Sequence, residues 1–255
     1  MKFHSPYLIK PHSKIKLSAI SSSQHHGVAD KDAAEPILAT RRTQLDQLQD
    51  VFYAAQTKAM LIVLQGMDTA GKDGTIRHIF SGINPQGCDV ASFKVPTTLE
   101  VKHDFLWRCH AQVPARGMIE IFNRSHYEDV LFPRVHGQIS TKEARRRMDD
   151  INTWEQSLAN NDVIVLKFFL HISKEEQLKR FEARAADPYK HWKISEEDWR
   201  NRKKWKEHIE AAEEMFERTS TKFAPWHLIE SEFKYYARLK VLKTVVKKFT
   251  QEFGE

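Results

Sequence analysis

The sequence contains little cysteine and no long apolar segment. Only Cys88 and Cys109 occur among 255 residues, which is too few for a disulfide framework, and no metal-ligand spacing surrounds them. No run of about 18 apolar residues is present, and the first residues lack the apolar core and cleavage site of a secretory signal. We therefore expect a cytoplasmic protein.

Acidic residues are in the minority. Lys and Arg total 40 against 34 Asp and Glu, which gives a formal net charge of +6. A positive chain favours an anionic partner, and phosphate, nucleic acid and a membrane surface all satisfy that condition. The charge therefore indicates a class of partner without identifying one.

Five apolar runs alternate with helical patterns along most of the chain. They are AMLIVL from Ala59, CDVASFKV from Cys88, MIEIF from Met118, VIVLKFFLHI from Val163 and WHLIE from Trp226. This alternation is typical of a parallel sheet with helices on both faces. We predict an α/β fold with three layers and a five-stranded parallel sheet, formed by residues 36–255. A helix is expected from Glu35 to Lys58, because its apolar residues recur at helical spacing.

Residues 1–35 are polar and show no sustained period, so they are expected to form an extended or partly ordered arm. Another distinct segment, from Lys174 to Lys206, is dense in Lys, Arg and aromatic residues. Pro188 interrupts a helical pattern there and Ser195 can cap a new helix, which predicts helix, exposed loop and helix. A basic hairpin of this kind, at about residues 180–206, would form a lid over a phosphate site. The alternative is a solvated pair of helices.

Residues 66–74 read GMDTAGKDG, which is nearly the GxxxxGK phosphate-binding loop. The loop follows a predicted strand and precedes a helix, so its glycines, its backbone N–H groups and Lys72 can surround an anion. Asp73 stands where a Ser or Thr hydroxyl normally holds Mg²⁺. A carboxylate must then hold the ion, and Asp68 is the candidate. The alternative role for Asp68 is to stabilise a turn.

The third predicted strand is followed by NRSHYED. Arg124 lies directly after this strand, where doubly wound sheets bind their ligands. Its alternative role is that of a structural ion-pair partner. Asn123 stands at the tip of the strand where a second acidic residue is usual, so the nearest carboxylates are Glu128 and Asp129.

Several stretches between about residues 50 and 250 closely resemble the polyphosphate kinase 2 family. They are LQGMDTAGKDGTIRHIFSGINP, ASFKVPT, FLWRCHAQVPARG, IFNRSHYEDVL, LKFFLHISKEEQ and TSTKFAPWHLI. The resemblance implies a P-loop kinase fold with a basic lid, and phosphoryl transfer between inorganic polyphosphate and the nucleotides AMP, ADP and ATP. It implies Mg²⁺ as the ion, with Mn²⁺ as a substitute, a homodimer or homotetramer, and neither nucleic acid nor membrane as a partner.

The resemblance also assigns roles to residues. The functional Asp, Lys and Arg of the family match Asp68, Lys72 and Arg124. Members that act only on diphosphates have Asp before this arginine and Asn after the following Tyr, whereas this chain has Asn123 and Glu128. Glu128 therefore indicates the subfamily that phosphorylates both AMP and ADP.

The complete set of predicted site residues falls into three groups. The catalytic group is Asp68, Lys72, Arg124 and Glu128, with Asp68 and Glu128 as metal ligands. The phosphate-binding group is Gly66, Ala70, Gly71, Asp73, Gly74, Thr75, Arg77, Arg134, Arg184 and Lys193. Further candidates for a cationic polyphosphate path are Arg116, Arg180 and Lys190, and about half of the path candidates are expected to contact phosphate. The nucleotide-binding group is Asn123 and Asp129.

Three other functions are compatible with parts of this pattern. A polyphosphate kinase for diphosphates only would share the fold and the loop. A conventional nucleotide kinase would use ATP as its donor, and consumption of polyphosphate separates the two. A nucleic-acid-binding module is supported by Trp192, Trp199 and Trp205, which alternate with cations as in base-stacking surfaces, although packing of the lid is the commoner use of such residues.

Overall fold

The computed structural model describes residues 7–253, except for the side chains of Tyr7 and Lys193. Within this range a six-stranded sheet has the order β1-β6-β5-β2-β4-β3. The strands are β1 (Tyr7–Ile9), β2 (Ala59–Gly66), β3 (Cys88–Ser92), β4 (Ile119–Asn123), β5 (Val163–His171) and β6 (Trp226–Glu230). The helices are α1 (Lys31–Ala55), α2 (Lys72–Phe80), α3 (Trp107–His110), α4 (Glu128–Val135), α5 (Thr141–Asn160), α6 (Lys174–Ala185), α7 (Glu196–Lys203), α8 (Trp205–Thr219) and α9 (Lys234–Phe253). Short 3-10 turns are η1 (Leu17–Ala19), η2 (Pro85–Gly87), η3 (Glu100–Lys102) and η4 (His191–Lys193).

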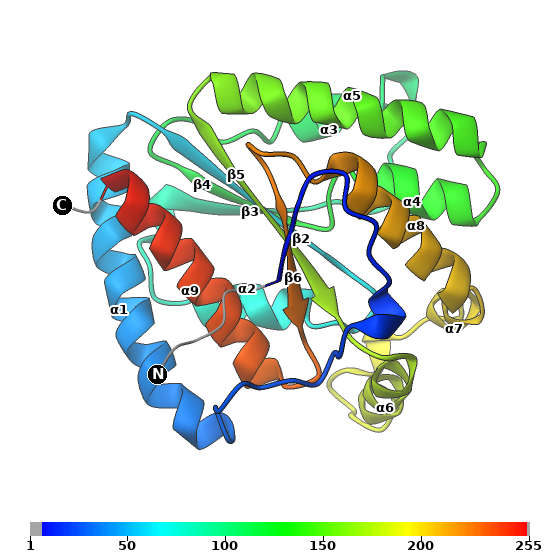
Figure 1. Ribbon diagram of the computed structural model, residues 1–255, viewed down its shortest axis with the longest axis horizontal. Helices are drawn as coiled ribbons and strands as arrows, with labels where there is room; N and C mark the ends of the chain where they lie inside the picture. Colours follow the sequence, from blue (N-terminus) through cyan, green and yellow to red (C-terminus); the bar gives the residue numbers. More distant parts are fainter. Residues whose placement is uncertain (1–6, 254–255) are drawn as a thin grey trace.

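The sheet lies between two layers of helices. α1, α2 and α9 lie on one face, and α4, α5 and α8 lie on the other (Figure 1). All nine residues of β5 are buried, as expected for a central strand covered on both faces. This burial explains why the strand reads as a continuous apolar run, interrupted only by Lys167. The three-layer α/β prediction is confirmed.

The five predicted parallel strands are all present as β2 to β6. β2 pairs with β4 and β5, β3 pairs with β4, and β5 pairs with β6, all in parallel. β1 is an additional, antiparallel strand beside β6, and it lies in the segment that was predicted as an arm. Three residues are too short a run to show a strand period in the sequence.

The described part of the N-terminal arm is packed against the domain. Ile9, Ile15 and Leu17 are buried in the same apolar cluster as α5 and α8. Glu213 of α8 accepts hydrogen bonds from the Lys16 ammonium, at 2.7 Å, and from the Leu17 N–H, at 2.8 Å. The arm is therefore extended but docked, and its last residues, from 31 onward, already belong to α1.

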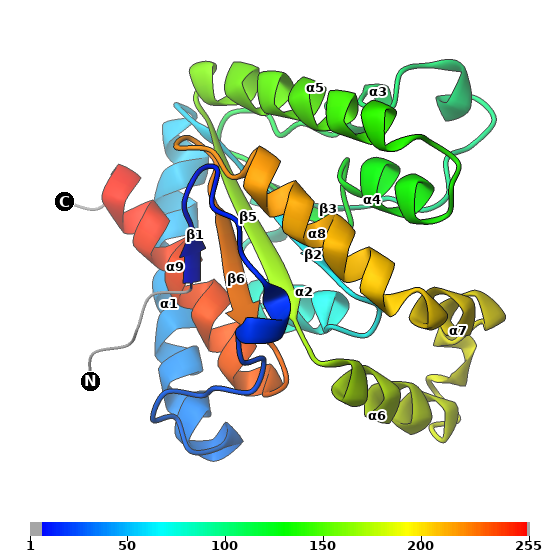
Figure 2. The same cartoon turned by 45° about the vertical axis from the view of Figure 1, so that its right-hand side comes forward.

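The lid has the predicted helix, loop and helix arrangement. α6 ends before Pro188, and Ser195 starts α7 with a reciprocal capping box to Asp198. α6 and α7 project beyond the carboxyl ends of the strands, and α8 returns from α7 to the body of the domain (Figure 2). Within residues 7–253, no helix combines the length and the apolar composition that crossing a bilayer requires.

Candidate active site

The loop between β2 and α2 has the backbone geometry of a phosphate cradle. Gly66 has a φ of +149° and Gly71 a φ of +112°, values that residues with a Cβ rarely adopt. A Cβ on Gly66 would lie 2.7 Å from the carbonyl oxygen of Leu170, so the loop runs tightly against β5. Because α2 begins at Lys72, the positive end of this helix adjoins the loop.

Lys72 lies back over its own loop. Its ammonium donates to the carbonyl oxygen of Gly66 at 2.7 Å and to that of Met67 at 3.4 Å. Burial lowers the pKa of Lys72, and the nearby Arg124 guanidinium lowers it further. Two cations are thus held close together at the loop, an arrangement that an anionic phosphate would stabilise.

Arg180 of α6 holds the phosphate loop in place by donating hydrogen bonds to its backbone carbonyl oxygens. Its guanidinium donates to the carbonyl oxygens of Thr69 at 2.9 Å, Ala70 at 3.0 Å and Ser231 at 2.6 Å, and also to the Glu176 carboxylate at 2.7 Å. Arg180 is buried and its donors are engaged with the protein. The prediction that Arg180 belongs to the polyphosphate path is therefore wrong. Its role here is to shape the loop.

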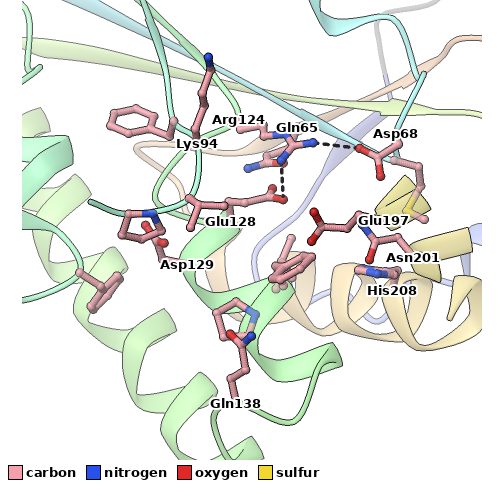
Figure 3. Close-up of a pocket in the computed structure, with 18 of the residues that line it drawn as sticks. Gln65, Asp68, Lys94, Arg124, Glu128, Asp129, Gln138, Glu197, Asn201 and His208 are labelled. Carbon is pink, nitrogen blue, oxygen red and sulfur yellow. Dashed lines mark hydrogen bonds and ion pairs between the residues drawn. The ribbon is translucent and has the colours of Figure 1, made fainter. Parts of the chain in front are cut away.

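Arg124 lies between two carboxylates at the carboxyl end of β4. Its Nη2 is 3.1 Å from Oδ1 of Asp68, and its Nη1 is 3.7 Å from Oε1 of Glu128 (Figure 3). Glu128, and after it Asp68, raises the pKa of Arg124, so the guanidinium stays charged. The backbone of Arg124 has a φ of +61°, an uncommon value for a residue with a side chain. Three residues predicted from two separate motifs, Asp68 from the loop and Arg124 and Glu128 from the segment after β4, therefore form one cluster.

This cluster borders a cavity of about 880 Å³. The cavity lies where the carboxyl ends of β2 and β4 meet, between the phosphate loop, α4 and the lid. Its lining includes Gln65, Gly66, Asp68, Phe93, Phe105, Arg108, Arg124, Glu128, Asp129, Phe132, Glu197, Asn201 and His208. The cavity has a charged end beside the phosphate loop and an aromatic portion farther from it. These two regions match the phosphates and the base of a nucleotide.

Asp129 supports the cavity wall through a buried ion pair. Both of its carboxylate oxygens accept from Arg108, with Nη2 to Oδ1 at 2.8 Å and Nε to Oδ2 at 3.1 Å. Arg108 also donates to the carbonyl oxygen of Lys94 at 2.8 Å, which ties the segment before α3 to α4. The Asp129 carboxylate therefore has a structural partner, and because the residue also lines the cavity, its contact with a nucleotide stays a prediction. Arg108 itself was not predicted.

Asn123 and Asp73 contact each other across the sheet edge. The Asn123 side-chain amide donates to Oδ1 of Asp73 at 3.0 Å, linking the end of β4 to the first turn of α2. Asp73 is exposed. The contact of Asn123 with a nucleotide and that of Asp73 with phosphate stay predictions, as do those of Ala70, Gly71, Gly74 and Thr75.

Two cations of the predicted polyphosphate path are paired with carboxylates of the protein. Arg134 pairs with Glu214 of α8 at 2.6 Å, and this contact joins α4 to α8. Arg116 pairs with Asp162 at 3.1 Å, and both precede strands, at the end of the sheet opposite the phosphate loop. Arg116 is thus placed away from the phosphate loop. Contact of Arg134 with phosphate stays a prediction, because the adjacent Phe132 and Pro133 line the cavity.

The remaining path candidates are only partly placed. Lys190 forms an ion pair with Asp187, and the side chain of Lys193 lies outside the described residues. Arg77 is exposed on α2 and Arg184 is half-buried on α6. Contact of Arg77, Arg184 and Lys193 with phosphate stays a prediction.

The structure adds two cations that the sequence reasoning missed. Lys234 and Arg238 lie one turn apart on α9, and Nη2 of Arg238 is 3.4 Å from the position that a Cβ on Gly74 would occupy. Burial lowers the pKa of Lys234, and Arg180, Arg238 and Arg184 lower it further. A group of cations therefore adjoins the start of α2. The four-residue spacing of Lys234 and Arg238 was the available signal.

The lid presents acceptor groups to the cavity. Glu197, Asn201 and His208 line it from α7 and α8 (Figure 3). Oδ1 of Asn201 and Nε2 of His208 are buried without a hydrogen-bond partner among the described residues. Arg202 of the lid instead donates to the Lys174 carbonyl oxygen and to Gln177 of α6. The lid is basic in composition, but the side chains on its cavity face include a carboxylate and an amide oxygen.

The residues at Arg124 fit a magnesium ion in their chemistry. Mg²⁺ prefers oxygen ligands and is usually held by one or two carboxylates together with water and substrate phosphates. Asp68 and Glu128 supply two such carboxylates on the cavity wall. Among the described residues no group of three or more His, Cys, Asp or Glu is arranged to hold a metal, so phosphate oxygens and water would complete the shell.

Comparison with known proteins agrees with this geometry. Residues 28–253 match the family model described as Polyphosphate kinase 2. The chain is 43% identical to an ADP-polyphosphate phosphotransferase of Rhodopseudomonas palustris, over 84% of this chain and 78% of that protein. It is 42% identical to an AMP/ADP-polyphosphate phosphotransferase of Meiothermus ruber, over 90% of this chain and 86% of that protein.

A solved structure shows the same architecture. The crystal structure of polyphosphate kinase 2 from Arthrobacter aurescens superposes with a TM-score of 0.91 and 37% identity, over 98% of this chain and 93% of the other. The fold, the loop and the extent of the family match lead to one conclusion. The chain belongs to the polyphosphate kinase 2 family of phosphotransferases.

Proposed function

We propose that this enzyme transfers the terminal phosphoryl group of inorganic polyphosphate to both AMP and ADP, forming ADP and ATP, in a reversible reaction that requires Mg²⁺. The observation that carries the proposal is the placement of Arg124 between Asp68 and Glu128 beside the phosphate loop. A cation and two carboxylates at one edge of a cavity can hold two phosphate groups and the ion between them.

The chemistry needs alignment and charge neutralisation more than proton transfer. The attacking oxygen belongs to a nucleotide phosphate and is already anionic, so no strong general base is required. Lys72 and Arg124 neutralise the transferring group, and the N–H groups of the loop orient it. When bound by Asp68 and Glu128, Mg²⁺ would supply further positive charge to the phosphate oxygens. Closure of the lid would exclude water, which would otherwise hydrolyse polyphosphate.

Acceptance of AMP rests on Glu128. This carboxylate lies on the cavity wall at 3.7 Å from Arg124, close to where the acceptor phosphate would meet the guanidinium. A monophosphate acceptor carries one phosphate fewer than a diphosphate, so additional protein groups must hold it in line with the donor. Glu128 would do so by helping Asp68 to hold Mg²⁺, whose positive charge would attract the acceptor phosphate.

The donor path is proposed along the cations next to α2. Arg184, Lys234 and Arg238 lie close enough together that Arg184 and Arg238 both lower the pKa of Lys234. Such mutual repulsion is relieved when a polyanion binds. Polyphosphate is a flexible chain with about one charge per phosphate, so a row of cations is the recognition that it needs.

The test mixes purified protein, Mg²⁺ and long-chain polyphosphate with either AMP or ADP and follows the nucleotides by chromatography. The proposal expects AMP to yield ADP and then ATP, and ADP to yield ATP. Removal of Mg²⁺ by a chelator should stop both reactions. Lys72→Ala, purified in the same way, should lose activity by a factor on the order of 10² or more, which excludes a contaminating kinase.

Other outcomes identify the alternatives. If only ADP is phosphorylated, the enzyme belongs with the diphosphate-specific members and the Glu128 argument is wrong. If polyphosphate is not consumed while ATP serves as donor to another acceptor, the protein is a conventional kinase. Near-wild-type turnover of Lys72→Ala would refute the role given to the phosphate loop.

A further inference from the structure

The segment that carries Arg124 is anchored on its buried side by a network of polar side chains. Ser125, His126 and Tyr127 follow Arg124 directly, and all three are completely buried. Ser125 Oγ contacts the amide of Gln65, the last residue before the phosphate loop, at 3.1 Å. An uncommon positive φ, as at Arg124, persists only where the surrounding structure holds the backbone in place. The three buried side chains that follow Arg124 provide this support.

Two of these side chains end on one carboxylate. The Tyr127 hydroxyl donates to Oε1 of Glu155 at 2.8 Å, and Nε2 of His126 lies 3.2 Å from the same oxygen. The Lys167 ammonium donates to Oε2 of Glu155 at 2.6 Å and to the Tyr127 hydroxyl at 2.9 Å. Glu155 and Lys167 are both completely buried. The segment from Arg124 to Tyr127 is thus hydrogen-bonded to both α5 and β5.

The same lysine also binds the end of the helix that returns from the lid. The third donor position of Lys167 is used by the carbonyl oxygen of Thr219, at 2.7 Å, and Thr219 is the last residue of α8. A cation is favourable at the carboxyl end of a helix. Trp226 closes the arrangement, with its Nε1 donating to Oγ1 of Thr219 at 2.9 Å. Lys167 therefore joins the segment that carries Arg124 to the carboxyl end of α8, the helix that follows the lid.

Stability alone is a weak reason for such a network. Taking a carboxylate and an ammonium out of water costs several kcal/mol per ion, and apolar replacements of similar volume are often as stable. A network whose donors and acceptors are matched does, however, specify one geometry. Its members also include two consecutive residues of the segment that positions Arg124 and Glu128.

We propose that Glu155, Lys167 and Tyr127 are positioning residues, which hold Arg124 at the phosphate loop and fix the end of α8 against the same segment. This inference rests on the proposed function for its kinetic consequence. Glu155, Lys167 and Tyr127 are not among the residues that line the cavity, so they act through Arg124. Loss of their network should slow the transfer step while leaving the binding of polyphosphate and nucleotide nearly unchanged.

The test compares Tyr127→Phe with Tyr236→Phe. The first change keeps the ring that packs on Trp226 and removes only the hydroxyl that binds Tyr127 to Glu155 and Lys167. Tyr236 is equally buried, on the other face of the sheet, and its hydroxyl has no hydrogen-bond partner among the described residues. Tyr127→Phe should lower kcat about tenfold or more and change KM for both substrates less than about twofold. Tyr236→Phe should keep wild-type kcat.

A structural measurement decides the inference separately from the reaction. In crystals of Tyr127→Phe, Arg124 should move away from Asp68, beyond the 3.1 Å contact of the native structure. An unmoved Arg124, or a lower melting temperature with unchanged kcat per folded molecule, overturns the inference. If the wild type itself transfers nothing from polyphosphate, the proposed function fails, and the position of Arg124 in the variant still decides the positioning role.

Discussion

Arg124 and Asp68 meet at 3.1 Å between Nη2 and Oδ1, although they follow different strands. β2 and β4 are parallel neighbours, with Leu64 opposite Asn123, so the residues after them emerge at the same edge of the sheet. This pairing brings the carboxylate of the phosphate loop to the arginine after β4. Three of the predictions below concern the residues at this edge.

Asp68→Asn should lower the rate of phosphoryl transfer by a factor on the order of 10² or more, because it removes a charge that is aligned with the reacting phosphates. Turnover at saturating polyphosphate and nucleotide measures the effect. Asp162→Asn is the matched control, since Asp162 also contacts an arginine at 3.1 Å but at the opposite end of the sheet. Equal losses in both variants would show that Asp68 acts only through stability.

Glu128→Asn should shift the acceptor preference from AMP toward ADP. The ratio of kcat/KM for AMP to that for ADP is expected to fall about tenfold or more, since a group that holds only the shorter acceptor is lost. Glu175→Asn serves as the control, because Glu175, like Glu128, lies in the first turn of a helix but is exposed on α6. A wild-type ratio in Glu128→Asn would remove the basis for the AMP assignment.

Gly66→Ala should destabilise the protein and impair phosphate binding. The new Cβ would meet the Leu170 carbonyl oxygen at 2.7 Å on a backbone with a φ of +149°, and such strain costs on the order of 1–3 kcal/mol. Gly82→Ala is the control, because nothing lies within 4 Å of its Cβ position. That change is expected to stay within about 0.5 kcal/mol. Denaturant unfolding measures both, and equal stabilities would contradict the close approach.

Glu120 should make the protein less stable as the pH rises. Its carboxyl is buried on β4, with Oε1 lacking a partner among the described residues. Burial, and then Asp89, raises its pKa to about 7 from the ordinary value of 4.5. The folded state therefore retains a proton that the unfolded state has already released. The stability from this group is present below pH 4.5 and is lost as the pH rises through 7, by roughly 3 kcal/mol at most.

Glu120→Gln should abolish this dependence. The free energy of unfolding of the variant, relative to wild type, is expected to be higher at pH 8 than at pH 5, because the amide carries no charge to bury. Denaturant melts of both proteins at the two pH values give the comparison. The same difference at both values would mean that Glu120 titrates as an ordinary surface carboxyl.

The parallel sheet was predictable because its central strands are buried on both faces. Such strands read as continuous apolar runs, and those from Ala59 and Val163 coincide with β2 and β5. The helix starts were predictable for a similar local reason, since Ser140 and Ser173 cap α5 and α6 through the N–H groups of Glu143 and Glu176. β1 was not predictable, because a run of three residues shows no strand pattern in the sequence and becomes a strand only through its pairing with β6.

The charged residues of the site were predictable only in part. Asp68, Lys72 and Arg124 stand at fixed distances from strand ends, so their convergence follows from a parallel sheet. Arg134 and Arg180 were candidates for the polyphosphate path on the basis of their positive charge. Arg134 binds Glu214 and Arg180 binds the phosphate loop, partners that belong to elements remote in sequence.

The sequence by itself determined the phosphate loop, the order of strands and helices along the chain and the chemical class of the ligand. Backbone preferences, apolar periodicity and helix capping act within a few residues, which is why they can be read locally. The tertiary structure alone decided which charges meet. Lys167 lies inside an apolar run and gave no sign of its role, because its contacts with Glu155, Tyr127 and Thr219 exist only after separate elements pack around it.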